Sequence, residues 1–322
     1  MSGILAVAEL TPQGSLHKMS LETLAAAQQL GGPVAVAVFG HNVSEAATAL
    51  ARYRFEKVYA LDHPLLAQYT ADGATAALAE LIARLEPRLV LFPHTYQTRD
   101  FAPKLATRCG RVLVSDVIAM QQEGDGIVLR RQLFQGKLVG DYRPAPGLAF
   151  ASLQAGAWRA DALQAGETPV ETVTPALDAA SIRQRPEAPF RESARAVDLA
   201  AAPIIVAVGR GIKEESNIGL AQELAEALGA ELAASRPICD NGWLPMERQV
   251  GSSGQTVAPK VYVALGISGA IQHLVGMKGS QCIVAINKDP DAPIFEVADY
   301  GIVGDIFEVV PPLIEQISKA KE

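Results

Sequence analysis

Cysteine is scarce in this sequence: three residues, Cys109, Cys239 and Cys282, occur in a chain of 322. They lie too far apart for a CxxC redox pair or for the usual spacing of metal ligands. We therefore interpret them as small core residues of a protein in a reducing compartment, the cytoplasm.

Long apolar runs are also missing. Runs such as residues 34–39 and 204–208 have the length of strands and fall far short of the roughly 20 residues that cross a bilayer. The first residues, MSGILAVAEL, lack a basic start and a cleavage-site pattern, so we expect a first strand there and no signal peptide. We expect no membrane insertion.

Basic charge is not in excess, because 28 Lys and Arg residues face 35 Asp and Glu residues for a net charge of −7. A nucleic-acid partner would require a dense basic stripe, and its absence argues against that class of protein. The sequence also shows no nucleophile–base pair, carboxylate dyad or metal-ligand cluster. We therefore expect no substrate-transforming site of the chain's own.

The first 110 residues alternate apolar runs with amphipathic stretches. The runs are apolar throughout, which is typical of parallel strands covered by helices on both faces. This pattern predicts an α/β domain with strands at 4–10, 33–40, 57–62 and 88–95 and helices at 21–30, 44–53, 74–85 and 101–109. Shorter strands follow at 116–122, 127–134 and 137–143.

Residues 160–200 lose periodicity and contain several prolines, so we expect the interdomain connection there. The length of the chain is enough for two domains, and we place them at 1–191 and 192–322. The second domain again predicts a parallel sheet, with strands at 204–208, 230–234, 260–266, 281–286 and 300–305 and helices at 214–228 and 308–321.

Polar residues of the second domain follow the ends of its predicted strands. They are Arg210, Ser235, Arg236, Ser268, His273 and Asn287. In open α/β sheets this edge binds ligands, and glycines such as those at 209, 211, 251, 254, 266 and 269 let backbone N–H groups approach an anion. The residues alone indicate a nucleotide or dinucleotide-cofactor domain. Singly, Ser268 also fits a helix cap, His273 a structural histidine and Asp305 a surface carboxylate.

The chain resembles the alpha subunits of electron-transfer flavoproteins. The resemblance is carried by GISGAIQH at 266–273, AINKDP at 285–290, APIF at 292–295 and ADYGIVGD at 298–305, in the order and spacing of that family. VAVGRGI, AASRP and RQVGSSG lie upstream, and SDVIA and TYQTRDFAPKLA extend the likeness into the first half. It therefore covers almost the whole chain.

This resemblance implies an adenine-nucleotide alpha-hydrolase-like N-terminal α/β domain and a Rossmann-like C-terminal domain that binds FAD. It also implies a redox carrier that pairs with a beta subunit, which itself holds AMP or a second FAD. Acyl-CoA or similar dehydrogenases would supply electrons, and a membrane quinone oxidoreductase would accept them.

Site residues carry over from the family by position. Arg210 and Ser235 would meet the pyrophosphate, and Arg236 would lie against the isoalloxazine. His273 would reach the pyrimidine carbonyl of the flavin, and Asn287 and Asp305 would hold the adenosine half. The segments beside the flavin and along the cofactor are Val250, Gly251, Ser252, Ser253 and Gly254, and Ser268, Gly269, Ala270, Ile271, Gln272 and His273.

One departure from the family lies in the flavin loop. Where the family has Gly-Gln-Thr-Gly, this chain has Gly251-Ser252-Ser253-Gly254. Ser253 keeps a hydroxyl that can reach the flavin N5 but lacks the methyl group that restricts the rotamer of threonine. In the first domain we expect Arg99 and Asp100 to form an ion pair or a helix cap.

Two other functions stay open from the residues alone. An NAD(P)-dependent oxidoreductase or transhydrogenase-like domain would use the same crevice for hydride transfer. A nucleotide sensor without redox function would use the N-terminal domain. Flavin absorption bands, bound pyridine nucleotide, or bound ATP or AMP would distinguish the three.

Overall fold

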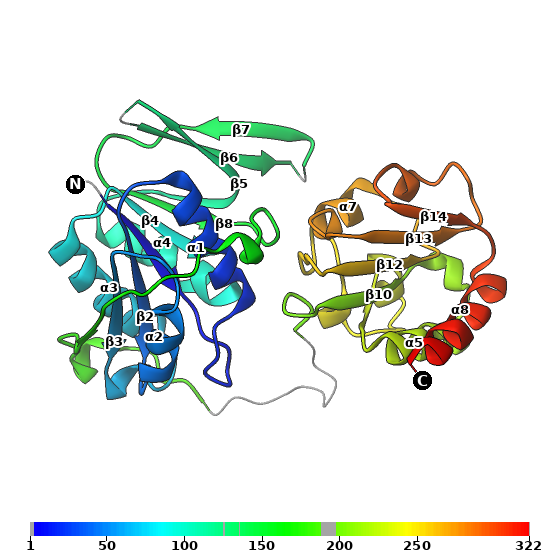
Figure 1. The fold of residues 1–322 in the computed structure, drawn as a ribbon, viewed down its shortest axis with the longest axis horizontal. Helices are drawn as coiled ribbons and strands as arrows, with labels where there is room; N and C mark the ends of the chain where they lie inside the picture. The colour runs from blue at the N-terminus through cyan, green and yellow to red at the C-terminus, as the bar shows by residue number, and fades with distance from the viewer. Residues whose placement is uncertain (1–2, 125, 135, 188–197, 322) are drawn as a thin grey trace. The chain divides into compact units, whose positions relative to one another are not determined.

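Two compact units divide the chain (Figure 1). The computed structural model describes residues 3–124, 126–134, 136–187 and 198–321. The N-terminal unit contains strands β1 to β9 and the C-terminal unit contains strands β10 to β14. The expected boundary between residues 191 and 192 lies outside the described residues.

A mixed sheet forms the centre of the N-terminal unit, with the strand order β7-β6-β5-β8-β4-β1-β2-β3-β9 in the described chain. β6 pairs antiparallel with β5 and β7, and the other neighbours pair parallel. The strands are β1 (Ile4–Ala8), β2 (Val34–Gly40), β3 (Lys57–Asp62), β4 (Leu89–Pro93), β5 (Leu113–Glu123), β6 (Gly126–Leu133), β7 (Leu138–Tyr142), β8 (Ala149–Leu153) and β9 (Val170–Val173).

Helices cover both faces of this sheet. Alternate residues of β1 face opposite sides, so Ile4 and Ala6 belong to one core while Leu5 and Val7 belong to the other. Residues of α1 and α2 complete the first core, and residues of α3 and α4 complete the second. The apolar strands are therefore buried on both faces, as the sequence predicts. The helices are α1 (Lys18–Leu30), α2 (Ser44–Leu50), α3 (Ala71–Leu85) and α4 (Tyr96–Arg108).

Part of the expected connection, which the sequence analysis included in the N-terminal domain, forms a strand that the sequence did not predict. Residues 170–173 form β9, which pairs parallel with β3 so that Val170 lies opposite Val58. β9 is an edge strand of four residues whose side chains are exposed or half-buried. Such a strand needs few apolar residues, and its sequence therefore gives little periodic signal.

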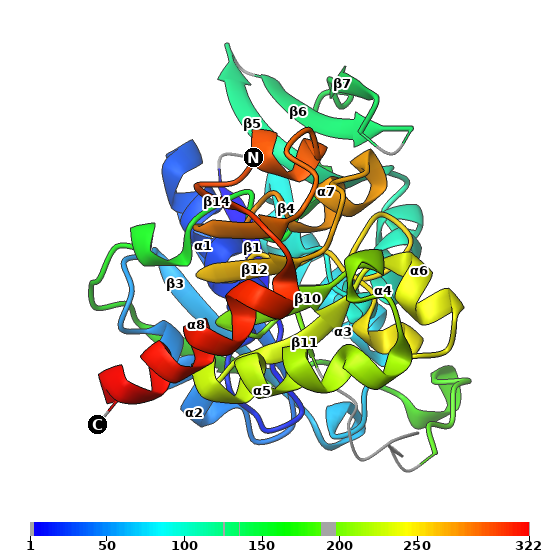
Figure 2. The same ribbon diagram turned by 90° about the vertical axis from the view of Figure 1, so that its right-hand side faces the viewer.

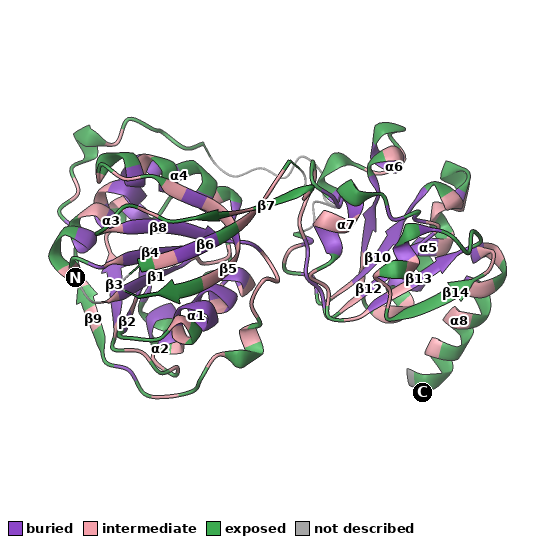
Figure 3. Cartoon of the chain, turned by 90° about the horizontal axis from the view of Figure 1, so that it is seen from above, coloured by how far each residue is buried: buried purple, intermediate pink, exposed green. Residues whose placement is uncertain are grey.

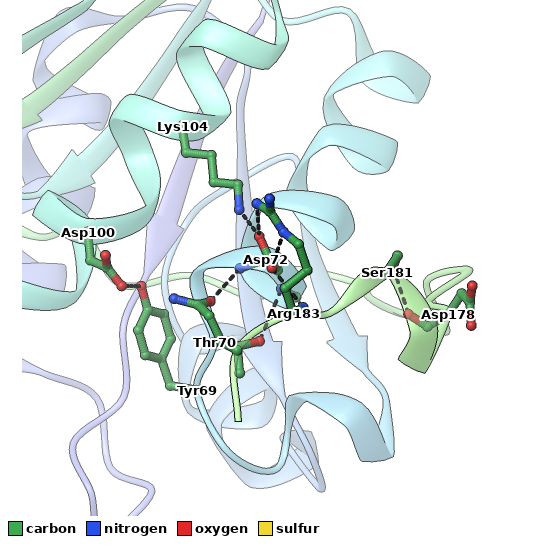
Figure 4. A network of polar contacts seen from close by, with 10 residues as sticks. Tyr69, Thr70, Asp72, Asp100, Lys104, Asp178, Ser181 and Arg183 are labelled. Atoms are coloured by element: carbon green, nitrogen blue, oxygen red, sulfur yellow. Dashed lines mark hydrogen bonds and ion pairs between the residues drawn. The ribbon is translucent and has the colours of Figure 1, made fainter. Parts of the chain in front are cut away.

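A buried carboxylate fastens the segment after β9 to the helices of the N-terminal unit (Figure 4). Asp72, at the start of α3, accepts a hydrogen bond of 2.9 Å from the backbone N–H of Arg183. It also forms ion pairs with Lys104 of α4 and with the guanidinium of Arg183. In return, the N–H of Asp72 donates to the side chain of Gln184 at 3.0 Å. Asp72 thus connects α3, α4 and the segment that follows β9.

The C-terminal sheet is parallel throughout, with the described strands in the order β11-β10-β12-β13-β14. Its strands are β10 (Ile204–Val208), β11 (Glu231–Ala234), β12 (Val261–Leu265), β13 (Ile283–Asn287) and β14 (Tyr300–Val303), and its helices are α5 (Ile218–Leu228), α6 (Arg236–Asp240), α7 (Ile271–Met277) and α8 (Ile306–Lys321). Short 3₁₀ turns lie at Pro64–Leu66, Ala160–Ala162, Ala179–Ser181, Arg210–Ile212, Glu215–Asn217, Met246–Arg248 and Pro293–Glu296.

The two faces of the C-terminal sheet also have separate cores. α5 and α8 lie side by side over one face (Figure 2) and pack on Val206 and Val263. Met277 of α7 packs over the other face with Ala207 and Tyr262. The central strands are buried and the edge strand β14 is exposed, as Figure 3 shows by colour. The expected two-domain α/β fold is confirmed.

Several local expectations differ from the structure. Cys239 is buried, but Cys109 and Cys282 are only half-buried. Arg99 and Asp100 lie near the start of α4 and form no ion pair with each other in the described structure; Thr95 caps that helix. Instead, Asp100 accepts a hydrogen bond from the hydroxyl of Tyr69 at 2.8 Å, and Arg99 stacks over the ring of Tyr96.

Among the described residues, no helix combines the length and the apolar character that crossing a bilayer requires.

Replacing Asp72 with alanine is expected to loosen the segment after β9. The change removes hydrogen bonds to charged and backbone donors, and it should lower the free energy of unfolding by about 1 to 3 kcal/mol. Trypsin should cleave after Arg183 several-fold faster, because that residue loses its backbone anchor. Asp178→Ala serves as the control, since Asp178 is exposed and its carboxylate accepts, among the described residues, only the local N–H of Ala180. Equal cleavage rates in both variants would contradict this role of Asp72.

Candidate functional site

A cavity of about 730 Å³ opens at the carboxyl edge of the C-terminal sheet. From β10 the chain crosses to β11 on one side, and from β12 it crosses to β13 on the other. The loops after β10 and β12 therefore diverge, and ligands of open α/β sheets bind at such a point. The volume falls in the usual range of about 300 to 1,000 Å³ for small-molecule sites.

Close contact between two loops forms the floor of this cavity. The N–H of Gly209 donates to the Leu265 carbonyl at 2.8 Å, and the N–H of Gly211 donates to the Gly266 carbonyl at 3.0 Å. A Cβ on Gly209 would lie 2.5 Å from the Gly266 oxygen, and one on Gly211 would lie 2.6 Å from the Gly266 Cα. Glycine is therefore required for the two loops to touch.

Four cationic residues and one carboxylate surround the cavity. The cations are Arg210, Lys213, Arg236 and Lys288, and the carboxylate is Asp289. Arg236 begins α6 and pairs with Asp240 one turn later at 3.2 Å, with 66% of its side chain exposed. This excess of positive charge suits an anionic ligand such as a diphosphate.

The loop after the 3₁₀ turn at 246–248 forms one wall. Val250, Gly251, Ser252 and Ser253 line the cavity. The hydroxyl of Ser253 accepts a hydrogen bond of 2.9 Å from the Nε2 of the buried Gln249. Since the hydroxyl accepts in this bond, its own proton stays available for another acceptor.

Asn287 uses its carboxamide within the protein. Its Nδ2 donates to the Ile267 carbonyl at 2.9 Å, and its Oδ1 accepts from the N–H of Asp289 at 3.0 Å. The residue therefore fixes the loops after β12 and β13 against each other. It lines the cavity from that braced position.

Asp305 lies outside the cavity lining. Its Oδ1 accepts from the N–H of Phe307 at the start of α8, and its Oδ2 pairs with Lys213 at 3.3 Å. The Phe307 N–H and the positive Lys213 hold the pKa of this carboxyl below its usual range. Through Lys213, Asp305 is nevertheless tied to the loop that follows β10.

His273 is buried beneath the cavity wall on α7, with 6% of its surface exposed. Its Nε2 lies 2.9 Å from the hydroxyl of Tyr262, and its Nδ1 has no partner among the described residues. Burial lowers the pKa of the imidazole to about 4. The ring is therefore neutral at neutral pH.

Of the sixteen residues assigned to the cofactor by position, twelve lie together around the cavity. Ser235, which precedes α6, and Ala270, which precedes α7, both line the cavity. The residue at the cap position of α7 is therefore Ala270 and not Ser268. The twelve are Arg210, Ser235, Arg236, Val250, Gly251, Ser252, Ser253, Ser268, Ala270, Gln272, His273 and Asn287. Outside the lining are Gly254, Gly269, Ile271 and Asp305.

Nine further residues line the cavity. Three of them, Gly209, Gly211 and Gly266, had been expected at this edge as glycines, and the other six had not been predicted. Lys288 and Asp289 directly follow β13, as Asn287 ends it, so the strand-end rule that selected Asn287 could have found them. Lys213 has a positive φ of 71°, and no simple sequence pattern predicts that backbone conformation or its place in the cavity lining. The nine are Gly209, Gly211, Lys213, Pro237, Gln249, Gly266, Ile267, Lys288 and Asp289.

Comparison with known proteins identifies the family of both units. The family described as "Electron transfer flavoprotein domain" matches residues 4–178, and the family described as "Electron transfer flavoprotein FAD-binding domain" matches residues 198–278. A protein of Thermoanaerobacterium thermosaccharolyticum named electron transfer flavoprotein subunit alpha is 39% identical over 318 residues, covering 96% of each chain.

Two further relatives agree with this result. The electron transfer flavoprotein subunit alpha of Bacillus subtilis is 39% identical over 314 residues, which cover 95% of this chain and 94% of that one. The protein FixB of Azotobacter vinelandii is 36% identical over 326 residues, which cover 94% of this chain and 88% of that one.

The contact between the two loops can be tested with a single methyl group. Gly211→Ala places a Cβ against the Gly266 backbone and should destabilise the C-terminal unit by about 1 to 3 kcal/mol, since backbone atoms cannot move aside cheaply. Gly219→Ala adds the same methyl group in α5, where it meets nothing within 4 Å, and should raise stability by up to about 1 kcal/mol. Thermal denaturation of both variants measures the difference. Equal melting temperatures would show that the loops can separate freely.

Proposed function

The chain belongs to the family of electron transfer flavoprotein alpha subunits, and from this premise we propose that it holds FAD in the cavity of its C-terminal unit. FAD is the cofactor of the family and electron transfer is its role. Family membership decides against the NAD(P)-dependent oxidoreductase and the nucleotide sensor.

The cavity fits FAD in position, size and charge. It lies where the loops of a parallel sheet diverge, and its volume suits a ligand of this size. Its basic residues suit the pyrophosphate, and the buried, unpartnered Nδ1 of His273 suits a polar atom of the ligand. The single observation that carries the proposal is this cavity within the unit that contains the FAD-binding domain.

We assign the residues of the cavity to parts of the cofactor. Arg210 and Ser235 would bind the pyrophosphate, while Ser253 and His273 would contact the flavin ring. The wall formed by Ser268, Ala270 and Gln272, together with Val250, Gly251 and Ser252, would lie along the cofactor, and Arg236 would place positive charge near the ring.

The assigned roles of the remaining residues are indirect. Asn287 would hold the adenosine side by bracing two loops, because its carboxamide is already bound within the protein. Asp305 would act through Lys213. Gly254, Gly269 and Ile271 would shape the loops around the cavity, and Gly269 leaves no room for a Cβ because the backbone nitrogen of Ile294 lies against that position.

When bound, FAD supplies the ability to take up and release electrons. The residues of this chain bind it, orient it and adjust the charge around it. A positive residue such as Arg236 favours the reduced, more negative cofactor, whereas its partner Asp240 opposes that effect. The balance between the two charges contributes to the reduction potential.

Alpha subunits of this family work with a beta subunit. A relative from Anaerotignum propionicum, 34% identical over 350 residues, is named acryloyl-CoA reductase electron transfer subunit beta. That name supports our proposal that acyl-CoA dehydrogenases or similar flavoenzymes supply electrons. We further propose a quinone oxidoreductase as acceptor, AMP or a second FAD in the beta subunit, and the cytoplasm as the location.

Exposed apolar side chains indicate where the N-terminal unit would meet its partner. Leu138, Val139 and Tyr142 lie on β7, and all are exposed. Leu138 and Tyr142 share one face of β7 and Val139 lies on the other, so both faces of this edge strand expose apolar surface, as is typical of a protein interface. We propose that this hairpin contacts the beta subunit.

Co-expression with the beta subunit should yield a yellow heterodimer with one FAD in this chain, whereas the chain alone should hold FAD weakly. Replacing Leu138 and Val139 together with serine should weaken the heterodimer at least tenfold by removing apolar surface. Val170→Ser, at the opposite edge of the same sheet, is the control and should leave it intact. Size exclusion and absorption spectra measure both results. A stable, fully flavin-loaded monomer would refute the proposed partnership.

Charge-removing variants test the placement of Arg236. Arg236→Gln should lower the midpoint potential of bound FAD by about 20 to 60 mV, where 59 mV corresponds to a tenfold change in a one-electron equilibrium. The effect stays small because the side chain is 66% exposed and already paired with Asp240. Asp240→Asn should shift the potential in the opposite direction. Spectroelectrochemistry at constant salt measures both, and shifts of the same sign would exclude a direct effect of charge.

A further inference from the structure

A buried tyrosine stands behind His273. Tyr262 lies on β12, its side chain is fully buried, and its hydroxyl contacts the Nε2 of His273 at 2.9 Å. The two rings meet edge to face, with centroids 6.1 Å apart. Among the described residues, the hydroxyl of Tyr262 forms no other hydrogen bond. Tyr262 does not belong to the cavity lining, whereas His273 does.

Both groups are neutral at neutral pH. Burial raises the pKa of the Tyr262 hydroxyl and lowers the pKa of the His273 imidazole to about 4. A neutral phenol carries one proton to donate, and a neutral imidazole carries one N–H and one unprotonated nitrogen. The pair therefore has two possible arrangements.

In the first arrangement, the tyrosine O–H donates to Nε2, and the imidazole proton lies on Nδ1. In the second, an Nε2–H donates to the phenol oxygen, and the tyrosine proton is left without an acceptor in a site that water does not reach. A buried donor without an acceptor costs more free energy than a satisfied one. The first arrangement is therefore favoured, because its only unsatisfied group is the N–H of a residue that lines the cavity.

We propose that Tyr262 is a positioning residue that fixes His273 as the Nδ1–H tautomer, so that His273 presents a hydrogen-bond donor to an acceptor atom of bound FAD. The tautomer follows from the Tyr262 contact alone, whereas its use in cofactor binding rests on the function proposed above. Without the hydroxyl, nothing on the Nε2 side prefers one tautomer, and part of the population would offer FAD a lone pair where it requires a donor.

Nitrogen NMR of the FAD-loaded heterodimer tests the tautomer. Protonated and unprotonated imidazole nitrogens have separate ¹⁵N resonances, and the signals that disappear in His273→Gln identify this residue among the histidines. We expect the Nδ1–H pattern in the wild type and its partial or complete loss in Tyr262→Phe. An Nε2–H pattern in the wild type, or an unchanged pattern in Tyr262→Phe, would overturn the inference.

FAD retention tests the use of that tautomer. Tyr262→Phe and His273→Gln should each raise the dissociation constant of FAD by about five- to tenfold. In the His273→Gln background, Tyr262→Phe should add no further loss, because Tyr262 acts through His273. Additive losses would overturn the inference by showing that Tyr262 serves only in packing.

Tyr300→Phe is the matched control, because it removes the same hydroxyl from an exposed tyrosine of the same sheet and should retain FAD like the wild type. A wild-type heterodimer that never binds FAD would refute the proposed function and leave the NMR result on the tautomer as a separate finding.

Discussion

The C-terminal unit depends on the contact between the loops after β10 and β12. Gly209 and Gly211 bring one loop against Gly266 of the other, with no space for a side chain between them. Because the loops touch at the floor, they can diverge above it, and the diverging walls create the cavity. Backbone hydrogen bonds from Gly209 and Gly211 join the two loops at this contact. Neighbouring groups such as Arg210 and Ser268 are therefore held at fixed positions around the ligand.

Much of the fold follows from the sequence, because its strands are apolar on both faces. β1 shows why: successive residues belong to opposite cores, which is possible only when helices cover both sides. β9 escaped prediction since an edge strand is built mainly by backbone pairing and requires no apolar pattern. Asp72 likewise gave no signal, because its partners Lys104 and Arg183 lie far from it in the sequence.

The candidate site was predictable in location but not in the use of each side chain. Strand ends predicted the edge of the sheet at which the cavity opens, and twelve of the residues assigned by position line it. In the sequence, Asn287 and Asp305 look like ligand residues. In the structure, the carboxamide of Asn287 forms hydrogen bonds to two loops, and the carboxylate of Asp305 caps the start of α8. Hydrogen bonds of this kind depend on distances between segments, which spacing along the chain does not reveal. The Tyr262 hydroxyl is a further example, since apolar neighbours in β12 hide it within a strand pattern.

The edge strands of the two sheets affect how readily the chain self-associates when it is made in excess of its partners. β7 and β14 end their sheets, and both expose apolar side chains, including Val139 and Tyr300. An unpaired edge offers backbone donors and acceptors to any extended segment that meets it. These strands have only five and four residues, so an added strand gains few hydrogen bonds from either. Because β7 and β14 are short, each limits the self-association that its exposed apolar side chains would otherwise favour.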